Sequence, residues 1–143
     1  MPSKPPYFPQ TYPFSCVPAC LRMVLAAYNF EISETELRSR CECDETGTSP
    51  SKAINAISEL GFNCHKANLI LEELKEYVLD KLFPIVYLRF SEDVKYSHAV
   101  VVYKITKEKI FVLDPEIGER ELDLNLFTEI WSRNLTIIVE KKN

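Results

Sequence analysis

Hydrophobic residues recur with two different periods along the chain, and the change of period comes near residue 84. Before it, apolar positions are three and four residues apart, as on one face of an amphipathic helix. This spacing predicts helices at 16–28, 33–38, 49–60 and 69–80, with one strand at 62–67 between the last two. After residue 84, runs rich in Val, Ile, Tyr and Phe predict strands at 84–90, 98–105, 109–114 and 135–140, with a short helix at 124–131.

Capping residues mark several helix ends. Ser33 opens a capping-box spacing, and Ser49 is followed by Pro50, a pair typical of an N-cap and the first helical position. Gly61 is expected to end the helix that Ser49 begins, because glycine readily adopts the left-handed conformation found after helix C-termini. We expect Asn68 to cap the next helix.

Helices come first in this order and strands second. The order predicts an α+β fold, with an antiparallel sheet packed against the N-terminal helices. A length of 143 residues fits one domain, 1–143. Residues 1–15 contain five prolines and no helical period, so we expect an extended arm laid over the body of the domain.

Charge and composition exclude several classes of protein. Seventeen basic against 21 acidic residues give a net charge of −4, which argues against nucleic acid as a partner, because phosphate binding needs a surplus of Lys and Arg. No apolar run approaches the roughly 20 residues of a membrane span, and the N-terminus lacks the apolar region of a signal peptide. We therefore expect a cytoplasmic protein without a membrane span. Its five cysteines, an odd number, favour free thiols over a disulfide framework.

Cys16 is the first candidate for chemistry. Pro18 is tolerated only in the first turn of a helix, so the first helix begins at Cys16 or Val17. A cysteine there lies beside free backbone N–H groups and the positive end of the helix dipole, which stabilise a thiolate. The alternative is that Cys16, like Cys20 one turn further along the same face, is a small buried hydrophobic residue.

His98 and Asp114 are the candidate partners of such a thiolate. His98 begins the most apolar strand and follows the loop at 91–97, where a side chain can be both anchored and accessible. Asp114 ends a predicted strand and precedes Pro115. If the two strands are antiparallel neighbours, the carboxylate reaches the imidazole and holds its tautomer. Otherwise His98 simply starts a strand and Asp114 is an ordinary turn residue.

A metal site is not expected. Cys41 and Cys43 are separated by one residue, and Cys64 directly precedes His65, whereas the ligand pairs of structural zinc usually have two to four residues between them. A glycine-rich phosphate-binding loop is also absent, and the chain contains only three glycines. The sequence therefore predicts neither a metal nor a cofactor.

Gln10 lies six positions before Cys16. Its side-chain amide and the backbone N–H of Cys16 are suitable as the two donors of an oxyanion hole, although by itself Gln10 is an ordinary surface residue. Together with His98 and Asp114, this order resembles the double-glycine leader peptidases, also called bacteriocin-processing peptidases, cysteine peptidase family thirty-nine. The resemblance covers nearly the whole chain and lies in the glutamine–five residues–cysteine spacing, in residues 16–25, 33–38, 47–49, 60–62, 97–102 and 112–118, and in Phe127 and Trp131.

The resemblance implies a papain-like fold and a cysteine peptidase that cleaves a peptide bond, such as that of a leader or precursor peptide, without a cofactor. It implies that Cys16 is the nucleophile, His98 the general base and acid, Asp114 the residue that orients His98, and Gln10 part of the oxyanion hole. Val17 departs from the family, which usually has a small residue after the cysteine. This difference is expected to narrow access to the thiolate.

Other functions remain open at this stage. A peptide-binding module of the same fold that does not catalyse, or an acyltransferase or amidase with the same triad, fits the same residues. The sequence contains no membrane span and no ATP-binding motif, so a transporter or maturation protein would be a separate partner. A peptidase domain without a transporter need not cleave double-glycine leaders, so other substrates also fit the sequence. The arm at 1–15 and the loop at 91–97 are candidate gates of the site.

Overall fold

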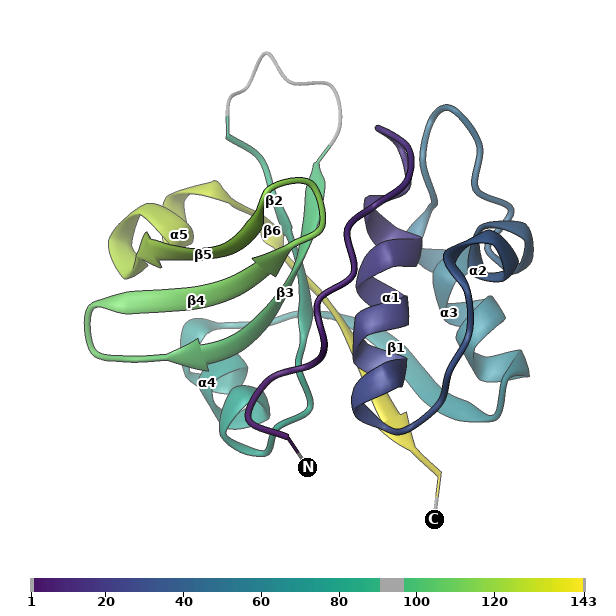
Figure 1. Cartoon of the computed structure of the whole chain (residues 1–143). Helices are drawn as coiled ribbons and strands as arrows, with labels where there is room; N and C mark the ends of the chain where they lie inside the picture. Colours follow the sequence, from purple (N-terminus) through teal and green to yellow (C-terminus); the bar gives the residue numbers. More distant parts are fainter. Residues whose placement is uncertain (1, 91–96, 143) are drawn as a thin grey trace.

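The protein, seen here in a computed structural model, is described at residues 2–90 and 97–142 (Figure 1). Its helices are α1 (Cys16–Ala27), α2 (Glu34–Arg40), α3 (Pro50–Glu59), α4 (Leu71–Leu79) and α5 (Leu124–Ile130). Its strands are β1 (Phe62–Asn68), β2 (Ile85–Leu88), β3 (His98–Ile105), β4 (Lys109–Asp114), β5 (Gly118–Asp123) and β6 (Trp131–Lys141). Within the described residues the strands form one antiparallel sheet in the order β1-β6-β2-β3-β4-β5. The predicted α+β fold is confirmed.

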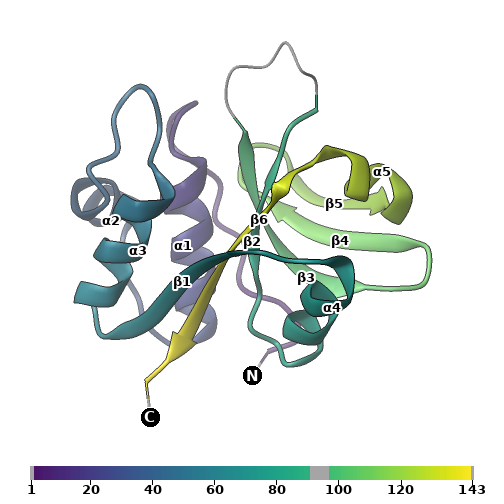
Figure 2. The same ribbon diagram turned by 180° about the vertical axis from the view of Figure 1, so that it is seen from behind.

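The central strands of the sheet are buried on both faces. Successive side chains of a strand point to opposite faces, so on β3 Ala99 and Val101 pack into the core that contains α1, while Val100 and Val102 pack into a second core with α4 and α5. Figures 1 and 2 show α1 to α3 on one side of the molecule and α4 and α5 beside the other part of the sheet. The helices at the N-terminus therefore cover only one of its faces.

Helix α1 is the central helix of the first core. It begins at Cys16, as Pro18 requires, and most of its residues are buried, including Leu21 and Val24, which have no exposed surface. It ends one residue before the predicted Tyr28, whose hydroxyl donates a 2.7 Å hydrogen bond to the Val139 carbonyl of β6. The burial fixes the position of the helix, and with it the position of its first residue.

The predicted caps are correct for two helices and wrong for a third. The side chain of Ser33 accepts a hydrogen bond from the Glu36 N–H, and that of Ser49 accepts one from the Lys52 N–H. Asn68 is instead the last residue of β1, and its amide donates to the Arg133 carbonyl at 2.7 Å. The corresponding helix, α4, begins later, after Ile70. The Asn68 side chain thus links β1 to β6. The residues around Asn68 in the sequence do not distinguish this role from helix capping.

Strand β5 and the first part of β6 were not predicted. Strand β5 reads Gly-Glu-Arg-Glu-Leu-Asp and buries only Leu122, so its charged residues hide the strand pattern. Strand β6 begins at Trp131, which pairs with Leu88 of β2, and not at 135, and a bulge separates this pair from the pairing of Thr136 with Val86. Arg133 and Asn134 in this bulge both have positive φ angles, near 54°, which non-glycine residues seldom adopt.

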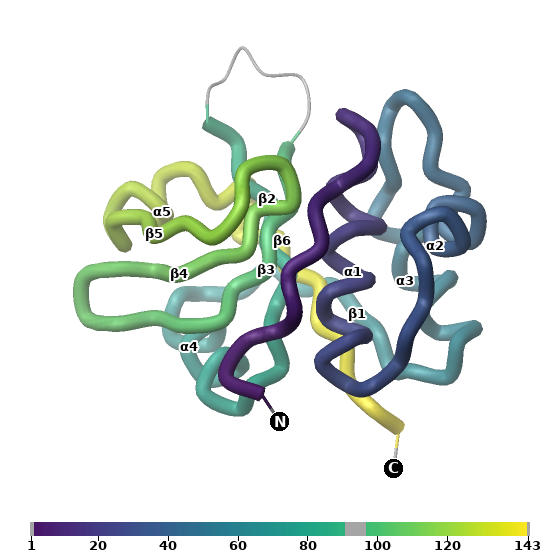
Figure 3. Tube along the Cα trace, viewed as in Figure 1, coloured from purple at the N-terminus to yellow at the C-terminus, as the bar shows by residue number. Residues whose placement is uncertain are grey.

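Residues 2–15 contain no helix or strand and run along the molecule beside α1 and the sheet (Figure 3). The hydroxyl of Tyr7 donates to the Asp114 carbonyl at 2.7 Å, and the Gln10 N–H donates to the Pro115 carbonyl at 2.8 Å. Lys4 forms an ion pair with Glu119. This segment, called the arm below, therefore attaches to the β4–β5 turn before it continues into α1. No helix in the described ranges 2–90 and 97–142 has the length and apolarity needed to cross a membrane.

Replacing Ser49 by alanine is expected to lower the free energy of unfolding by about 1 kcal/mol, because the first turn of α3 loses its capping acceptor. Urea unfolding followed by circular dichroism measures the change. Ser51→Ala, at an exposed position in the same turn, is the matched control and should leave stability nearly unchanged. Equal losses in the two variants would contradict the capping role.

Candidate active site

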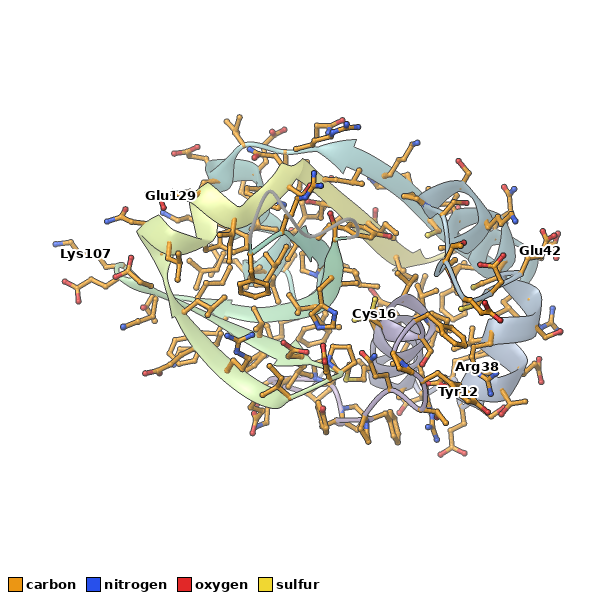
Figure 4. All side chains as sticks on the ribbon, turned by 90° about the horizontal axis from the view of Figure 1, so that it is seen from above. Tyr12, Cys16, Arg38, Glu42, Lys107 and Glu129 are labelled. Atoms are coloured by element: carbon orange, nitrogen blue, oxygen red, sulfur yellow. The ribbon has the colours of Figure 1, made fainter. Side chains whose placement is uncertain are left out.

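Cys16 stands at the N-terminus of α1, between the helices and the sheet (Figure 4). Its side chain is partly exposed, unlike that of Cys20 on the next turn, which is fully buried and contacts the Ala99 carbonyl through its sulfur at 3.4 Å. The backbone N–H groups of the first turn of α1 have no partners within the helix, and they favour negative charge beside them. The predicted difference between the two cysteines is thus present in the structure.

His98 and Asp114 lie next to each other on neighbouring strands. His98 is the first residue of β3 and Asp114 the last of β4, and these strands are antiparallel partners. The Nε2 atom of His98 is 2.6 Å from Oδ1 of Asp114. An ionised carboxylate can only accept, so Nε2 carries the proton and Nδ1 is the ring nitrogen left for another partner.

The Asp114 carboxylate has no exposed surface, and both of its oxygens are hydrogen-bonded. Besides His98, Oδ1 accepts from the Glu116 N–H at 2.9 Å, and Oδ2 accepts from Nη1 of Arg120 at 3.1 Å. Burial by itself would raise the pKa of Asp114, but the hydrogen bonds and positive charges of these partners outweigh it and lower the pKa. The carboxylate is therefore ionised and fixed in one orientation.

Arg120 is a residue of this cluster that the sequence analysis did not identify. It lies on β5, two residues after Gly118, which pairs with Asp114 in the register of the sheet. Its guanidinium also lies over the Phe90 ring, 5.4 Å from the centroid. A turn signal at Pro115 and Gly118 was available, but the charged residues after it hide the strand that returns beside Asp114.

The electrostatic surroundings of His98 favour its charged form. Burial lowers the pKa of the imidazole, but the hydrogen bonds with Asp114 and Cys16, and their negative charges, outweigh burial and raise the pKa to about 10. A thiol, an imidazole and an orienting carboxylate in this order are what nucleophilic attack on a carbonyl requires.

Gln10 lies on the arm, close to Cys16 along the chain. Its Nε2 donates one hydrogen to the Tyr12 carbonyl at 2.8 Å. Because an amide nitrogen carries two hydrogens, one remains available. Its Oε1 is buried and has no partner among the described residues. Gln10 is not among the residues that line the cavity described next. The structure therefore groups Cys16, His98 and Asp114 and holds Gln10 on the arm, where its backbone N–H bonds to Pro115, the residue after Asp114.

A cavity of about 530 Å³ opens beside Cys16 and His98. One wall comes from the helical side, with Val17 and the loop at 45–48, and the other comes from the sheet, with Tyr87 and the bulge of β6. Val17 is almost fully buried and lines this wall beside Cys16, and its expected narrowing of access to the thiolate stays a prediction. The cavity therefore lies between the N-terminal helices and the sheet.

The other cysteines and His65 are not grouped as a metal site in the part of the chain that the structure describes. All five cysteines are free thiols, and burial raises the pKa values of Cys41 and Cys64 to about 12. His65 is exposed on β1. Across residues 2–90 and 97–142, no three His, Cys, Asp or Glu side chains are grouped so that they could hold a metal ion. Of the loop proposed as a gate, residues 91–96 lie outside the described residues.

Solved structures share this fold. The peptidase domain of Streptococcus ComA superposes with a TM-score of 0.84 at 23% identity, covering 99% of this chain and all of that domain. A double-glycine-motif protease from an AMS/PCAT transporter, in complex with its leader peptide, gives a TM-score of 0.84 at 21% identity, with coverage of 98% and 94%. These likenesses establish the fold.

Sequence comparison identifies the family. The lactococcin-G-processing and transport ATP-binding protein LagD of Lactococcus lactis is 32% identical over 117 residues, or 82% of this chain, which spans only 16% of LagD. An uncharacterized protein of Methanothermobacter marburgensis is 24% identical, with coverage of 94% of this chain and 88% of its own length. The sequence model of the Peptidase C39 family matches residues 4–143. The chain belongs to the peptidase C39 family.

Proposed function

We propose that the protein is a cysteine peptidase in which Cys16 is the nucleophile, His98 the general base and acid, and Asp114 the residue that orients His98. The observation that carries the proposal is the 2.6 Å contact between His98 and the buried Asp114, next to a thiol at the start of a helix. Family membership supports it. Gln10, with its remaining amide hydrogen, and the Cys16 N–H are the proposed donors to the oxyanion.

The proposed reaction proceeds through an acyl-enzyme. The Cys16 thiolate adds to the carbonyl carbon of the scissile peptide, and the carbonyl oxygen becomes an oxyanion held by the two donors. His98 gives its proton to the nitrogen of the leaving amine as the C–N bond breaks, which leaves a thioester on Cys16. A water molecule, deprotonated by His98, then attacks the thioester and releases the acid, and the thiolate and imidazolium are restored.

The proposed substrate is a peptide precursor with a leader segment. LagD is named for processing lactococcin G, and the protein from the AMS/PCAT transporter is named a double-glycine-motif protease and was solved in complex with a leader peptide. A peptide that ends in Gly-Gly before a fluorescent amide is therefore the first probe. A separate transporter or maturation partner and the cytoplasmic location stay predictions.

Replacing Cys16 by alanine is expected to reduce hydrolysis of the Gly-Gly probe by more than about 10³-fold, because the nucleophile is lost. Fluorescence release measures the rate, and circular dichroism checks that the fold is retained. Cys64→Ala, at a half-buried thiol on β1, is the control and should remain active. Turnover that survives in Cys16→Ala would refute the peptidase. Wild-type protein that binds the probe without cleaving it or forming a thioester would favour the binding module.

Among the five thiols, Cys16 is expected to react fastest with iodoacetamide at neutral pH. Burial raises the pKa values of Cys20, Cys41, Cys43 and Cys64 and so suppresses their thiolates. His98→Ala should slow only the reaction of Cys16, because the thiolate loses its imidazolium partner. Mass spectrometry of each modified peptide measures the rates. A Cys16 rate that does not depend on His98 would contradict the proposed pairing.

Replacing Asp114 by asparagine is expected to lower the pKa of His98 from about 10 toward its ordinary value of 6.5. Carbon-13 NMR of the imidazole ring as a function of pH measures the midpoint. Because the folded-state pKa lies above 6.5, protonation of His98 stabilises the folded wild type. That contribution is complete below pH 6.5 and is lost as the pH rises to about 10. The difference in the free energy of unfolding between the wild type and Asp114→Asn should shrink across this pH range. If the NMR titration midpoint of His98 is the same in both proteins, Asp114 does not hold the proton on His98.

A further inference from the structure

Glu34 is a buried carboxylate that the proposed reaction does not use. It is the first residue of α2 and is only 4% exposed. One oxygen, Oε1, accepts a 2.9 Å hydrogen bond from the Thr11 N–H and is 3.3 Å from the Ser15 hydroxyl. The other, Oε2, accepts from Nε of Arg38 at 3.1 Å. Burial of a carboxylate is costly unless it is paired and hydrogen-bonded, and here both oxygens have partners.

The partners of Glu34 on the arm lie between Gln10 and Cys16. Thr11 directly follows Gln10, and Ser15 directly precedes Cys16 and is the N-cap of α1. Ser15 does not cap the helix through its side chain, and its buried hydroxyl points back into the arm. Glu34 therefore contacts the segment 10–16, which joins the two proposed oxyanion donors, at the residue next to each donor.

The Tyr12 carbonyl is the central acceptor within this segment. It accepts from Nε2 of Gln10 at 2.8 Å, from the Ser15 N–H at 3.1 Å and from the Ser15 hydroxyl at 3.0 Å. The Tyr12 N–H in turn donates to the Ser15 hydroxyl oxygen at 3.0 Å. The orientation of the Gln10 amide thus depends on a closed turn, and Glu34 holds that turn against α2.

Arg38 supports the turn from outside. Its guanidinium, which pairs with Glu34, also lies 4.5 Å from the centre of the Tyr12 ring, and Figure 4 shows the two side chains close together. The Tyr12 ring stacks on Phe14 with 5.4 Å between centroids and 7° between planes, and Phe14 lines the cavity. The carboxylate therefore connects α2 both to the donors and to the cavity wall.

We propose that Glu34 is a positioning residue that holds segment 10–16 in the conformation in which the Gln10 amide and the Cys16 N–H converge on one oxyanion. The inference rests on the proposed function. Its physical basis is that donors stabilise an oxyanion only when they are fixed before the charge develops, and that hydrogen bonds to an ionised carboxylate are stronger than neutral ones. Glu34 acts through the segment and has no contact with the reacting atoms.

The chain contains a matched control for this inference. Glu36 forms the same type of i,i+4 ion pair with Arg40, at 2.8 Å, but on the exposed face of the same helix. Glu36→Ala removes a helix carboxylate and an ion pair without touching segment 10–16. Glu34→Ala removes the acceptor of Thr11, whereas Glu34→Gln keeps a neutral amide oxygen in its place.

Glu34→Ala is expected to lower kcat for the Gly-Gly probe by about tenfold or more, since displacing one oxyanion donor costs a large part of its contribution. KM and the rate of Cys16 alkylation by iodoacetamide should not change, because alkylation needs the thiolate and His98 but no oxyanion hole. Amide hydrogen exchange at 11–16 should accelerate. Glu34→Gln should have an intermediate kcat, and this variant carries the test if Glu34→Ala does not fold. Glu36→Ala should match the wild type.

Two results would overturn the inference. The first is a kcat in the Glu34 variants equal to that of Glu36→Ala. The second is a parallel fall of kcat and of the Cys16 alkylation rate, because it would show that the whole site is lost. The proposed function fails by a different result, namely turnover that survives Cys16→Ala, and the inference then falls with it. Turnover that needs Cys16 but is insensitive to Glu34 overturns the inference alone.

Discussion

The hydrogen bonding of the buried Asp114 carboxylate is the constraint on which the candidate site depends. A charge without exposed surface is tolerated only when it is fully paired, and removing one partner of such a group costs about 3–5 kcal/mol. Its partners come from β3 through His98, from the turn after β4 through Glu116, and from β5 through Arg120. The backbone of the same residue also holds the arm through Tyr7. Satisfying this one carboxylate therefore fixes the imidazole and the edge strand β5 relative to β4, and the backbone of the same residue adds the arm.

The position of Cys16 has a different origin, because it is set by packing. Helix α1 is buried along most of its length against the sheet, and Cys16 is its first residue. The thiol and the imidazole thus belong to separate parts of the molecule, one placed by a helix in the core and the other by a strand. The arm connects these parts, since it contacts the β4–β5 turn and α2 before it reaches Cys16. The cavity forms at this junction.

The sequence predicted the features that are determined by residues close to one another along the chain. The start of α1, the caps Ser33 and Ser49 and the strand that begins at His98 each follow from a few neighbouring residues and are confirmed. The adjacency of His98 and Asp114 followed from one further assumption, that two successive strands pair.

Other features depend on contacts between distant residues, and the sequence did not reveal them. Asn68 was wrongly expected to cap α4 because its actual partner, Arg133, is 65 positions away. Arg120 was missed together with β5, whose charged residues carry no apolar period. Glu34 looked like part of an ordinary capping sequence, and only the return of the arm to α2 shows that it is buried.

The contacts that assemble the site join residues far apart along the chain. Tyr7 and Asp114 are 107 positions apart, and Cys20 and Ala99 beneath the site are 79 apart. Contacts of such long range are slow to form, because closing large loops costs entropy before any contact is gained. A nascent or truncated chain that lacks β4 lacks both the Asp114 carboxylate and the residue to which Tyr7 of the arm is anchored. The proposed hydrolytic activity is thus coupled to completion of the fold, so that an unfinished molecule cannot attack peptide bonds in its surroundings.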